Sequence, residues 1–247
     1  MADVKGARLL ILLAVAGLLP TRALPGDFPV PKIRFQSVDG VTLSGHRFGR
    51  GTDGVILAHR FPTDQISWFP FAESIQARDW TALTFDFRGY GTSDGEREIA
   101  KIDRDLAGAV HYARGSGAKR IILIGASMGG TAALKVSAAE PVDGVVVLSP
   151  SMAFLGLSSE EDLPKIRAPK FFLVSEVEMN VPVQSVRRQF KSAPEPKRLE
   201  VVPDSAHGSR MLDGEQGKRI QGGNSRICRL HFRTATSRSR EARGRGA

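Results

Sequence analysis

The chain has 247 residues, of which 41% are hydrophobic and 25% charged, and it carries a formal net charge of +9. This balance excludes intrinsic disorder, collagen and a polytopic membrane protein, and the length suits one large domain or two small ones. The single cysteine, Cys228, excludes a disulfide framework and a Cys-rich zinc site.

The N-terminal segment has the composition of an export signal. Lys5 and Arg8 precede an apolar run over residues 9–19, and small residues follow up to Ala23. These are the features of a secretory signal peptide. An eleven-residue run spans only ~16 Å as a helix, so we expect no stable membrane span. We predict a signal peptide over residues 1–23 and a periplasmic or extracellular protein, with a buried N-terminal helix as the alternative.

From residue 32 onward, strands and helices alternate. The dipeptide Asp39-Gly40 predicts a hairpin, short continuous apolar runs predict buried strands, and apolar spacing of 3.6 residues predicts helices. The predicted strands cover residues 33–37, 41–47, 55–58, 81–87, 121–124, 145–148, 171–174 and 199–202, and the predicted helices residues 67–78, 99–114, 128–139 and 183–191. This alternation predicts an α/β domain over residues 32–213, with a mainly parallel sheet and helices on both faces.

Only residues 150–169 leave room for an insertion between the predicted elements. About twenty residues are too few for a large lid domain. We therefore expect a single domain with an open site that accepts small substrates.

A serine between glycines marks the candidate active site. The sequence Gly125-Ala126-Ser127-Met128-Gly129 follows a predicted strand and precedes an Ala-rich predicted helix. In this context G-x-S-x-G predicts a tight turn that holds the hydroxyl out of the sheet, at a helix N-terminus. The glycines are expected where neighbouring backbone leaves no room for a Cβ. We predict that Ser127 is a nucleophile, with a structural glycine-rich turn as the alternative.

A serine nucleophile needs a base and an acid that orients the base. Among the five histidines, His207 is the candidate base, because it lies in a loop of small residues after the last predicted strand. Glu178 is the favoured acid in the loop after the preceding strand, and Glu176 is its competitor. The order Ser127, Glu178, His207 is nucleophile, acid, base.

Two backbone N–H groups are expected to form an oxyanion hole. Met128, directly after the nucleophile, is expected to supply one of them. The other is expected from the loop His59-Arg60-Phe61-Pro62 after the strand over residues 55–58, and Phe61 is our choice.

These motifs resemble the α/β-hydrolase superfamily, and most closely small lidless bacterial hydrolases such as serine aminopeptidases and dienelactone hydrolases. The resemblance covers roughly residues 33–213 and rests on the serine turn and on three further stretches: His59 to Pro62, Phe85 to Gly95 and Ser205 to Gly208. It implies an α/β-hydrolase fold and a serine hydrolase that cleaves an ester, thioester or small amide. A carboxylic ester is the favoured substrate.

The same resemblance implies no metal, nucleotide or redox cofactor, and a small-molecule acyl substrate as the partner. A non-catalytic binding protein on this fold and an aminopeptidase-type peptidase are the alternatives. Acyl group, leaving group and oligomeric state stay open at this stage.

Several positions are distinctive against the family pattern. Arg60 stands where the family usually has Gly, and it is expected to narrow the oxyanion loop or to place a cation near the substrate carbonyl. Glu178 stands where the family more often has Asp. The stretch after Asp213 lacks the apolar periodicity of the family's closing helix. Asp86 and Arg88 are expected to order the loop around them.

The basic charge is concentrated in the C-terminal tail. Residues 214–247 contain nine Lys or Arg and two Glu, and so carry +7 of the net +9. An Arg-rich arm for nucleic acid or an anionic surface, a solvated disordered tail and a shifted reading frame are the three interpretations. We favour the shifted frame, under which the final helix is missing, and we do not expect nucleic acid as a partner.

Overall fold

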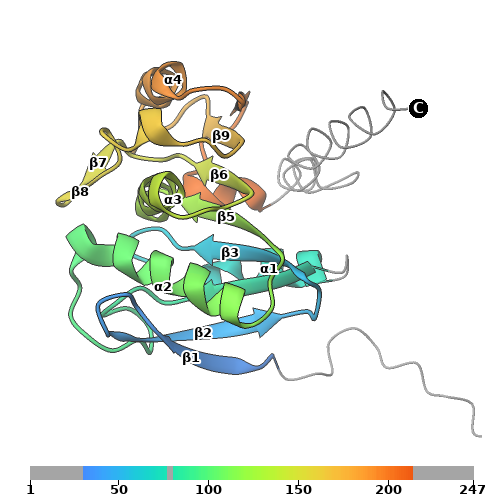
Figure 1. Ribbon diagram of the computed structural model, residues 1–247. Coiled ribbons are helices and arrows are strands. Elements are labelled where there is room, and N and C mark those ends of the chain that lie inside the picture. Colours follow the sequence, from blue (N-terminus) through green and yellow to red (C-terminus); the bar gives the residue numbers. More distant parts are fainter. Residues whose placement is uncertain (1–29, 77–79, 214–247) are drawn as a thin grey trace, which may run out of the picture.

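A computed structural model describes residues 30–76 and 80–213 (Figure 1). The predicted signal peptide at residues 1–23, the tail at 214–247 and the question of a closing helix lie outside the described residues. Across the described part of the chain, no helix is both long and apolar enough to cross a bilayer.

Eight strands form one sheet at the centre of the molecule. They are β1 (Lys32–Gln36), β2 (Thr42–Phe48), β3 (Asp53–Ala58), β4 (Trp80–Phe85), β5 (Arg120–Ala126), β6 (Gly144–Leu148), β9 (Lys170–Ser175) and β10 (Lys197–Val202). Their spatial order is β1-β2-β4-β3-β5-β6-β9-β10. The pairs β1–β2 and β2–β4 are antiparallel, and all pairs from β4 to β10 are parallel. The predicted mainly parallel sheet is confirmed.

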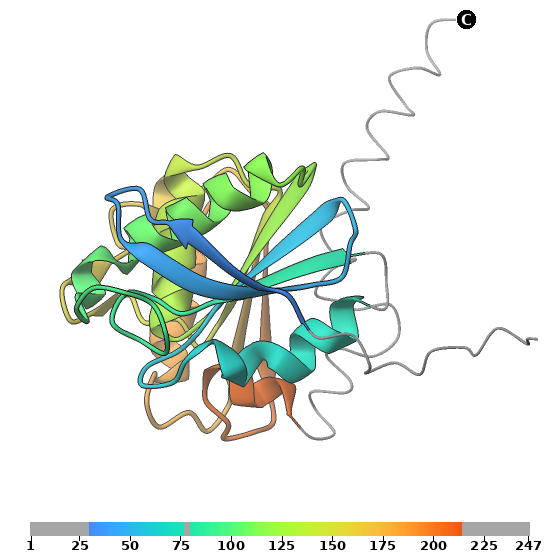
Figure 2. The same cartoon turned by 90° about the horizontal axis from the view of Figure 1, so that it is seen from below.

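Helices cover both faces of this sheet. The longer ones are α1 (Phe69–Gln76), α2 (Ile102–Gly115), α3 (Met128–Ala139) and α4 (Val183–Ser192), and the short 3-10 turns are η1 (Gln65–Trp68), η2 (Ile99–Lys101), η3 (Leu163–Lys165) and η4 (Gly208–Leu212). Helices α2, α3 and α4 pack on one face, whereas η1, α1 and η4 pack on the other (Figure 2). The central strand β5 is buried from Ile121 to its end, as its continuous apolar run predicts.

Two of the differences between the predicted and the observed element boundaries have clear physical reasons. The helix predicted over residues 67–78 is split into η1 and α1. Pro70, at the second position of α1, has no N–H to donate, so α-helical bonding begins only after it. The strand predicted over residues 81–87 ends at Phe85, because the backbone N–H groups of Phe87 and Arg88 donate to the side chains of His59 and Asp105 rather than to a neighbouring strand.

The stretch at residues 150–169 contains a small hairpin that the sequence did not predict. Strands β7 (Ala153–Phe154) and β8 (Leu157–Ser158) pair antiparallel beside α3, and η3 follows them. Leu157 is buried in the core. Strands of two residues are too short to give a periodic signal, so sequence patterning could not reveal them.

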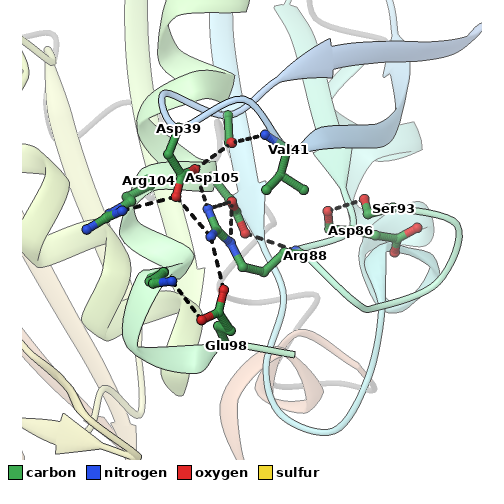
Figure 3. A network of polar contacts seen from close by, with 10 residues as sticks. Asp39, Val41, Asp86, Arg88, Ser93, Glu98, Arg104 and Asp105 are labelled. Atoms are coloured by element: carbon green, nitrogen blue, oxygen red, sulfur yellow. Dashed lines mark hydrogen bonds and ion pairs between the residues drawn. The ribbon is translucent and has the colours of Figure 1, made fainter. Parts of the chain in front are cut away.

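A buried arginine ties three distant segments together (Figure 3). The Arg88 guanidinium donates to Asp105 of α2 at 2.6 and 2.9 Å and to Asp39 of the β1–β2 turn at 2.6 and 3.0 Å. Its backbone N–H also donates to Asp105. The bonds from Arg88 hold the pKa of Asp39 well below its usual range, whereas burial raises the pKa of Asp105. This network orders the loop after β4, as expected for Arg88.

Candidate active site

Ser127 lies between β5 and α3 in a strained backbone conformation. Its φ of 53° and ψ of −118° are unusual for a residue with a side chain. A Cβ at Gly125 would lie closer than 3.0 Å to the backbone of Gly129, and a Cβ at Gly129 would lie equally close to the carbonyl oxygen of Ala58. Both glycines are therefore required, for the steric reason expected from the sequence.

The turn presents Ser127 at the N-terminus of the twelve-residue helix α3. The first N–H groups of a helix have no intrahelical acceptor, and the helix dipole adds partial positive charge there. The Ser127 hydroxyl forms no hydrogen bond with any described residue. The N–H of Met128 belongs to this first turn, where it suits a developing negative charge.

His207 and Glu178 meet at the same edge of the sheet. His207 Nδ1 lies 3.1 Å from Oε1 of Glu178, and the Glu178 side chain is fully buried. Gly208, next to His207, packs against the residue before Ser127, since a Cβ on Gly208 would lie 3.3 Å from the Cβ of Ala126. The histidine loop therefore lies beside the serine turn.

The contacts of Glu178 determine which imidazole nitrogen carries the proton. Burial alone would raise the pKa of Glu178, but hydrogen bonds from His207, Ser149 and the N–H of Asn180 outweigh burial and lower it. An ionised carboxylate only accepts hydrogen bonds, so Nδ1 of His207 must be the donor. In the neutral ring, Nε2 is then an unprotonated acceptor, and it has no partner among the described residues.

Glu176, the competing acid, is placed differently. Its side chain is exposed, and its backbone N–H donates to the carbonyl oxygen of Val202 at 2.8 Å. Within the described chain, the carboxylate that contacts His207 is Glu178.

Ser149 is a site residue that sequence reasoning missed. It lies directly after β6 with a φ of 48°, and it is fully buried. Its hydroxyl donates to Oε2 of Glu178 at 2.8 Å and accepts from the N–H of Gly208 at 3.3 Å. One hydroxyl therefore positions both the acid and the histidine loop. The sequence offered one signal for Ser149. This residue directly follows β6, the strand that pairs with β5, and β5 leads into the serine turn.

The loop after β3 is fixed by the carbonyl group of Arg60. This oxygen accepts hydrogen bonds from Nδ1 of His59 and from the N–H and hydroxyl of Thr63. In a trans peptide, the C=O and the following N–H point in opposite directions. The N–H of Phe61 is therefore directed away from these three donors, and it has no acceptor in the described part of the protein.

His59 is a packed histidine that supports this loop. It is fully buried against Phe87 and Tyr90, and its Nε2 accepts from the N–H of Phe87 at 3.2 Å. Burial lowers the pKa of His59 to about 4, so the ring is neutral at physiological pH. His59 is therefore a structural support for the Arg60–Phe61 peptide.

Arg60 packs beside the histidine loop. A Cβ on Gly208 would lie 3.2 Å from Cδ of Arg60, and Nη1 of Arg60 donates to the Phe61 carbonyl at 3.3 Å. Burial, and then the nearby charge of Arg210, lower the pKa of Arg60. The stem of Arg60 thus fills space next to Gly208. The expected narrowing of the oxyanion loop by Arg60 stays a prediction.

The other described histidines have partners elsewhere. His46 bonds to Gln65, and His111 pairs with Glu140 near the end of α3. His231 lies outside the described residues. Over residues 30–76 and 80–213, no three His, Cys, Asp or Glu side chains gather as a candidate metal site.

Comparisons with known proteins agree with this fold. A family model described as "Alpha/beta hydrolase family" matches residues 55–207. An uncharacterised protein of Mycobacterium tuberculosis is 26% identical over 235 residues, which cover 84% of this chain and 83% of that protein.

Two solved esterases are similar in structure. Esterase Pf2001 of Pyrococcus furiosus is 21% identical with a TM-score of 0.67, over 74% of this chain and 86% of that one. A thermophilic esterase from Thermogutta terrifontis, solved with malate bound, is 18% identical with a TM-score of 0.67, over 83% and 98% of the two chains. At these identities the structures show a common fold.

Proposed function

This chain belongs to the alpha/beta hydrolase family, and from that premise we propose that it is a serine hydrolase that cleaves carboxylic esters through an acyl-enzyme. Ser127 is the nucleophile, His207 the general base and Glu178 the acid that orients it. The observation that carries the proposal is the hydrogen bond from His207 Nδ1 to buried Glu178, which leaves Nε2 unprotonated beside the Ser127 turn.

In the first step, Nε2 of His207 takes the proton as Oγ of Ser127 attacks the substrate carbonyl carbon. The imidazolium that forms is stabilised by the Glu178 carboxylate, which stays ionised. His207 then returns the proton to the alcohol oxygen, the bond from the carbonyl carbon to that oxygen breaks, and the acyl group stays on Ser127. In the second step, His207 takes a proton from a water molecule that attacks the acyl carbon. The bond from that carbon to Oγ of Ser127 then breaks, and His207 returns the proton to Oγ as the acid product leaves.

The negative charge that develops on the carbonyl oxygen needs two donors. Phe61 and Met128 are the proposed pair, because each N–H lies in fixed backbone next to the serine turn. The helix dipole of α3 favours the same charge.

Support for an ester as the substrate comes from the fold neighbours, which include esterases. The finer resemblance to serine aminopeptidases and dienelactone hydrolases stays a prediction. Thioesters and small amides share the acyl-enzyme chemistry and are secondary candidates.

The function is tested by covalent labelling and turnover together. The wild-type protein is expected to react with a fluorophosphonate probe, to carry the adduct on the peptide that contains Ser127, and to hydrolyse p-nitrophenyl acetate or butyrate. Heat-denatured protein is the control and should not be labelled. A folded protein that neither reacts nor turns over these esters would be a binding protein on the same fold.

The acid is tested by a matched pair of substitutions. Glu178→Gln is expected to lower kcat about 10³- to 10⁴-fold, because an amide stabilises neither the correct tautomer nor the imidazolium. Glu176→Gln, two residues away on the same loop, should keep kcat within about twofold, since surface substitutions away from the site have small effects. The measurement is kcat for p-nitrophenyl butyrate. The opposite ranking of the two variants would reassign the acid to Glu176.

A further inference from the structure

Large exposed apolar side chains gather on the loops that carry the proposed catalytic groups. Phe61, the proposed oxyanion donor, is 39% exposed, and Val177 and Met179, on either side of Glu178, are 65% and 90% exposed. Leu155, at the tip of the β7–β8 hairpin, is 65% exposed. Such clustering beside a reactive group differs from the scattered apolar residues of an ordinary surface.

Leu155 is strained as well as exposed. It and Gly156 form the two-residue turn of the hairpin, with φ values of 44° and 86°. A turn with two positive φ values favours Asn-Gly, because side chains such as leucine are disfavoured in the left-handed region. Because the Leu155 side chain is exposed, burial of that side chain does not offset the free-energy cost of the left-handed conformation. A strained and solvent-exposed leucine therefore points to a role in binding.

The hairpin is held against the oxyanion loop. Leu157 is buried in the core, and Gly156 packs against Ala100, since a Cβ there would lie 3.1 Å from the Cβ of Ala100. The ring of Phe154 lies 5.5 Å, centroid to centroid, from the ring of Phe61. The two rings form one apolar surface, and the exposed tip residue Leu155 follows Phe154 directly in the chain.

This surface adjoins the position of the reacting carbonyl. The N–H and the ring of Phe61 belong to one residue, so a substrate oxygen bound to that N–H brings its substituents near the ring. The alcohol group leaves toward His207, which precedes η4 on one face of the sheet. The hairpin lies beside α3 on the opposite face (Figure 1). The acyl group is therefore the substituent directed toward the hairpin.

We infer that Phe61, Phe154 and Leu155 form an apolar wall for the acyl chain, and that the preferred substrates are esters of medium-length apolar acids rather than acetate esters. The inference rests on the proposed function and adds the substrate class. Because transfer of each methylene group from water to an apolar surface is favourable, selectivity should rise with acyl length until the chain passes Leu155.

The test compares p-nitrophenyl octanoate with p-nitrophenyl acetate. Wild type is expected to show a kcat/KM at least about tenfold higher for octanoate, from partial burial of the added methylenes. Leu155→Asn should lower kcat/KM for octanoate about tenfold and leave acetate within twofold. The same substitution should raise Tm by about 2–4 °C, because asparagine tolerates the left-handed turn.

Val38→Asn is the matched control, since Val38 is an exposed apolar residue in the β1–β2 turn, 51% exposed and remote from the serine turn. It should leave the octanoate-to-acetate ratio unchanged. Leu155→Gly, which removes the side chain without strain, should reproduce the selectivity loss of Leu155→Asn. An unchanged ratio in both Leu155 variants overturns the apolar wall and leaves the esterase proposal standing. A wild type inactive on both esters overturns the proposed function, and the wall with it.

Discussion

Replacing Ser127 by alanine is expected to lower kcat for ester hydrolysis by about five to six orders of magnitude. In the proposed reaction, Oγ of Ser127 is the atom that bonds to the acyl group in the acyl-enzyme. The N–H groups of Phe61 and Met128 would remain, so a residual rate above the uncatalysed one should persist. The fluorophosphonate adduct should be lost completely.

Ser137→Ala is the control for this substitution. Ser137 lies on the same helix, α3, and its buried hydroxyl donates to the carbonyl of Leu134 at 2.9 Å. Its loss should leave kcat within about twofold and shift Tm by a few degrees at most. Both variants are measured on p-nitrophenyl butyrate after thermal unfolding shows that they are folded. A Ser127→Ala enzyme with more than about 1% of wild-type kcat would contradict the acyl-enzyme mechanism.

Replacing Arg88 by methionine is expected to lower the free energy of unfolding by about 3–5 kcal/mol. Asp105 is fully buried, and Arg88 donates to it from both its side chain and its backbone. Methionine has a similar length but leaves the Asp105 carboxylate in the protein interior without its cation. Because this network connects the β1–β2 turn, the loop after β4 and α2, the loss should appear as global unfolding in urea.

The matched control is Arg34→Met, which breaks an ion pair with Asp94 at the surface. The side chains of Arg34 and Asp94 are 48% and 57% exposed, so the free energy of unfolding should fall by about 1 kcal/mol or less. The double variant Arg88→Met/Asp105→Leu should recover part of the stability that Arg88→Met loses, because no buried carboxylate is left unpaired. Equal effects of Arg88→Met and Arg34→Met would show that the buried network contributes no more to the free energy of unfolding than an exposed ion pair.

The architecture was predictable because its signals are local. The runs that became β3, β5, β6 and β9 are continuously apolar, and a strand buried on both faces has that pattern. The glycines around Ser127 were predictable for a similar reason, since a tight strand-to-helix turn excludes Cβ atoms from its immediate neighbours.

The parts of the site that escaped prediction depend on contacts between distant segments. Glu178 was favoured from the sequence, but its competitor Glu176 lies in the same loop, and the folded path of that loop shows that Glu178 is the carboxylate facing His207. Ser149 is 29 residues from Glu178 in sequence, so the bond between them leaves no pattern in the chain. The hairpin around Leu155 combines strands of two residues with a turn residue that propensity disfavours there.

The carbonyl of Arg60 has a consequence for the energetics of the reaction. In water, the dipoles around a carbonyl oxygen must reorient as negative charge grows on it, and that reorientation costs free energy. Here His59 and Thr63 donate hydrogen bonds to the Arg60 carbonyl and so fix the Arg60–Phe61 peptide without any substrate. In the proposed reaction, the Phe61 N–H dipole that faces the substrate is thus aligned before any ester arrives, and the free energy of alignment is supplied when the chain folds rather than at each turnover.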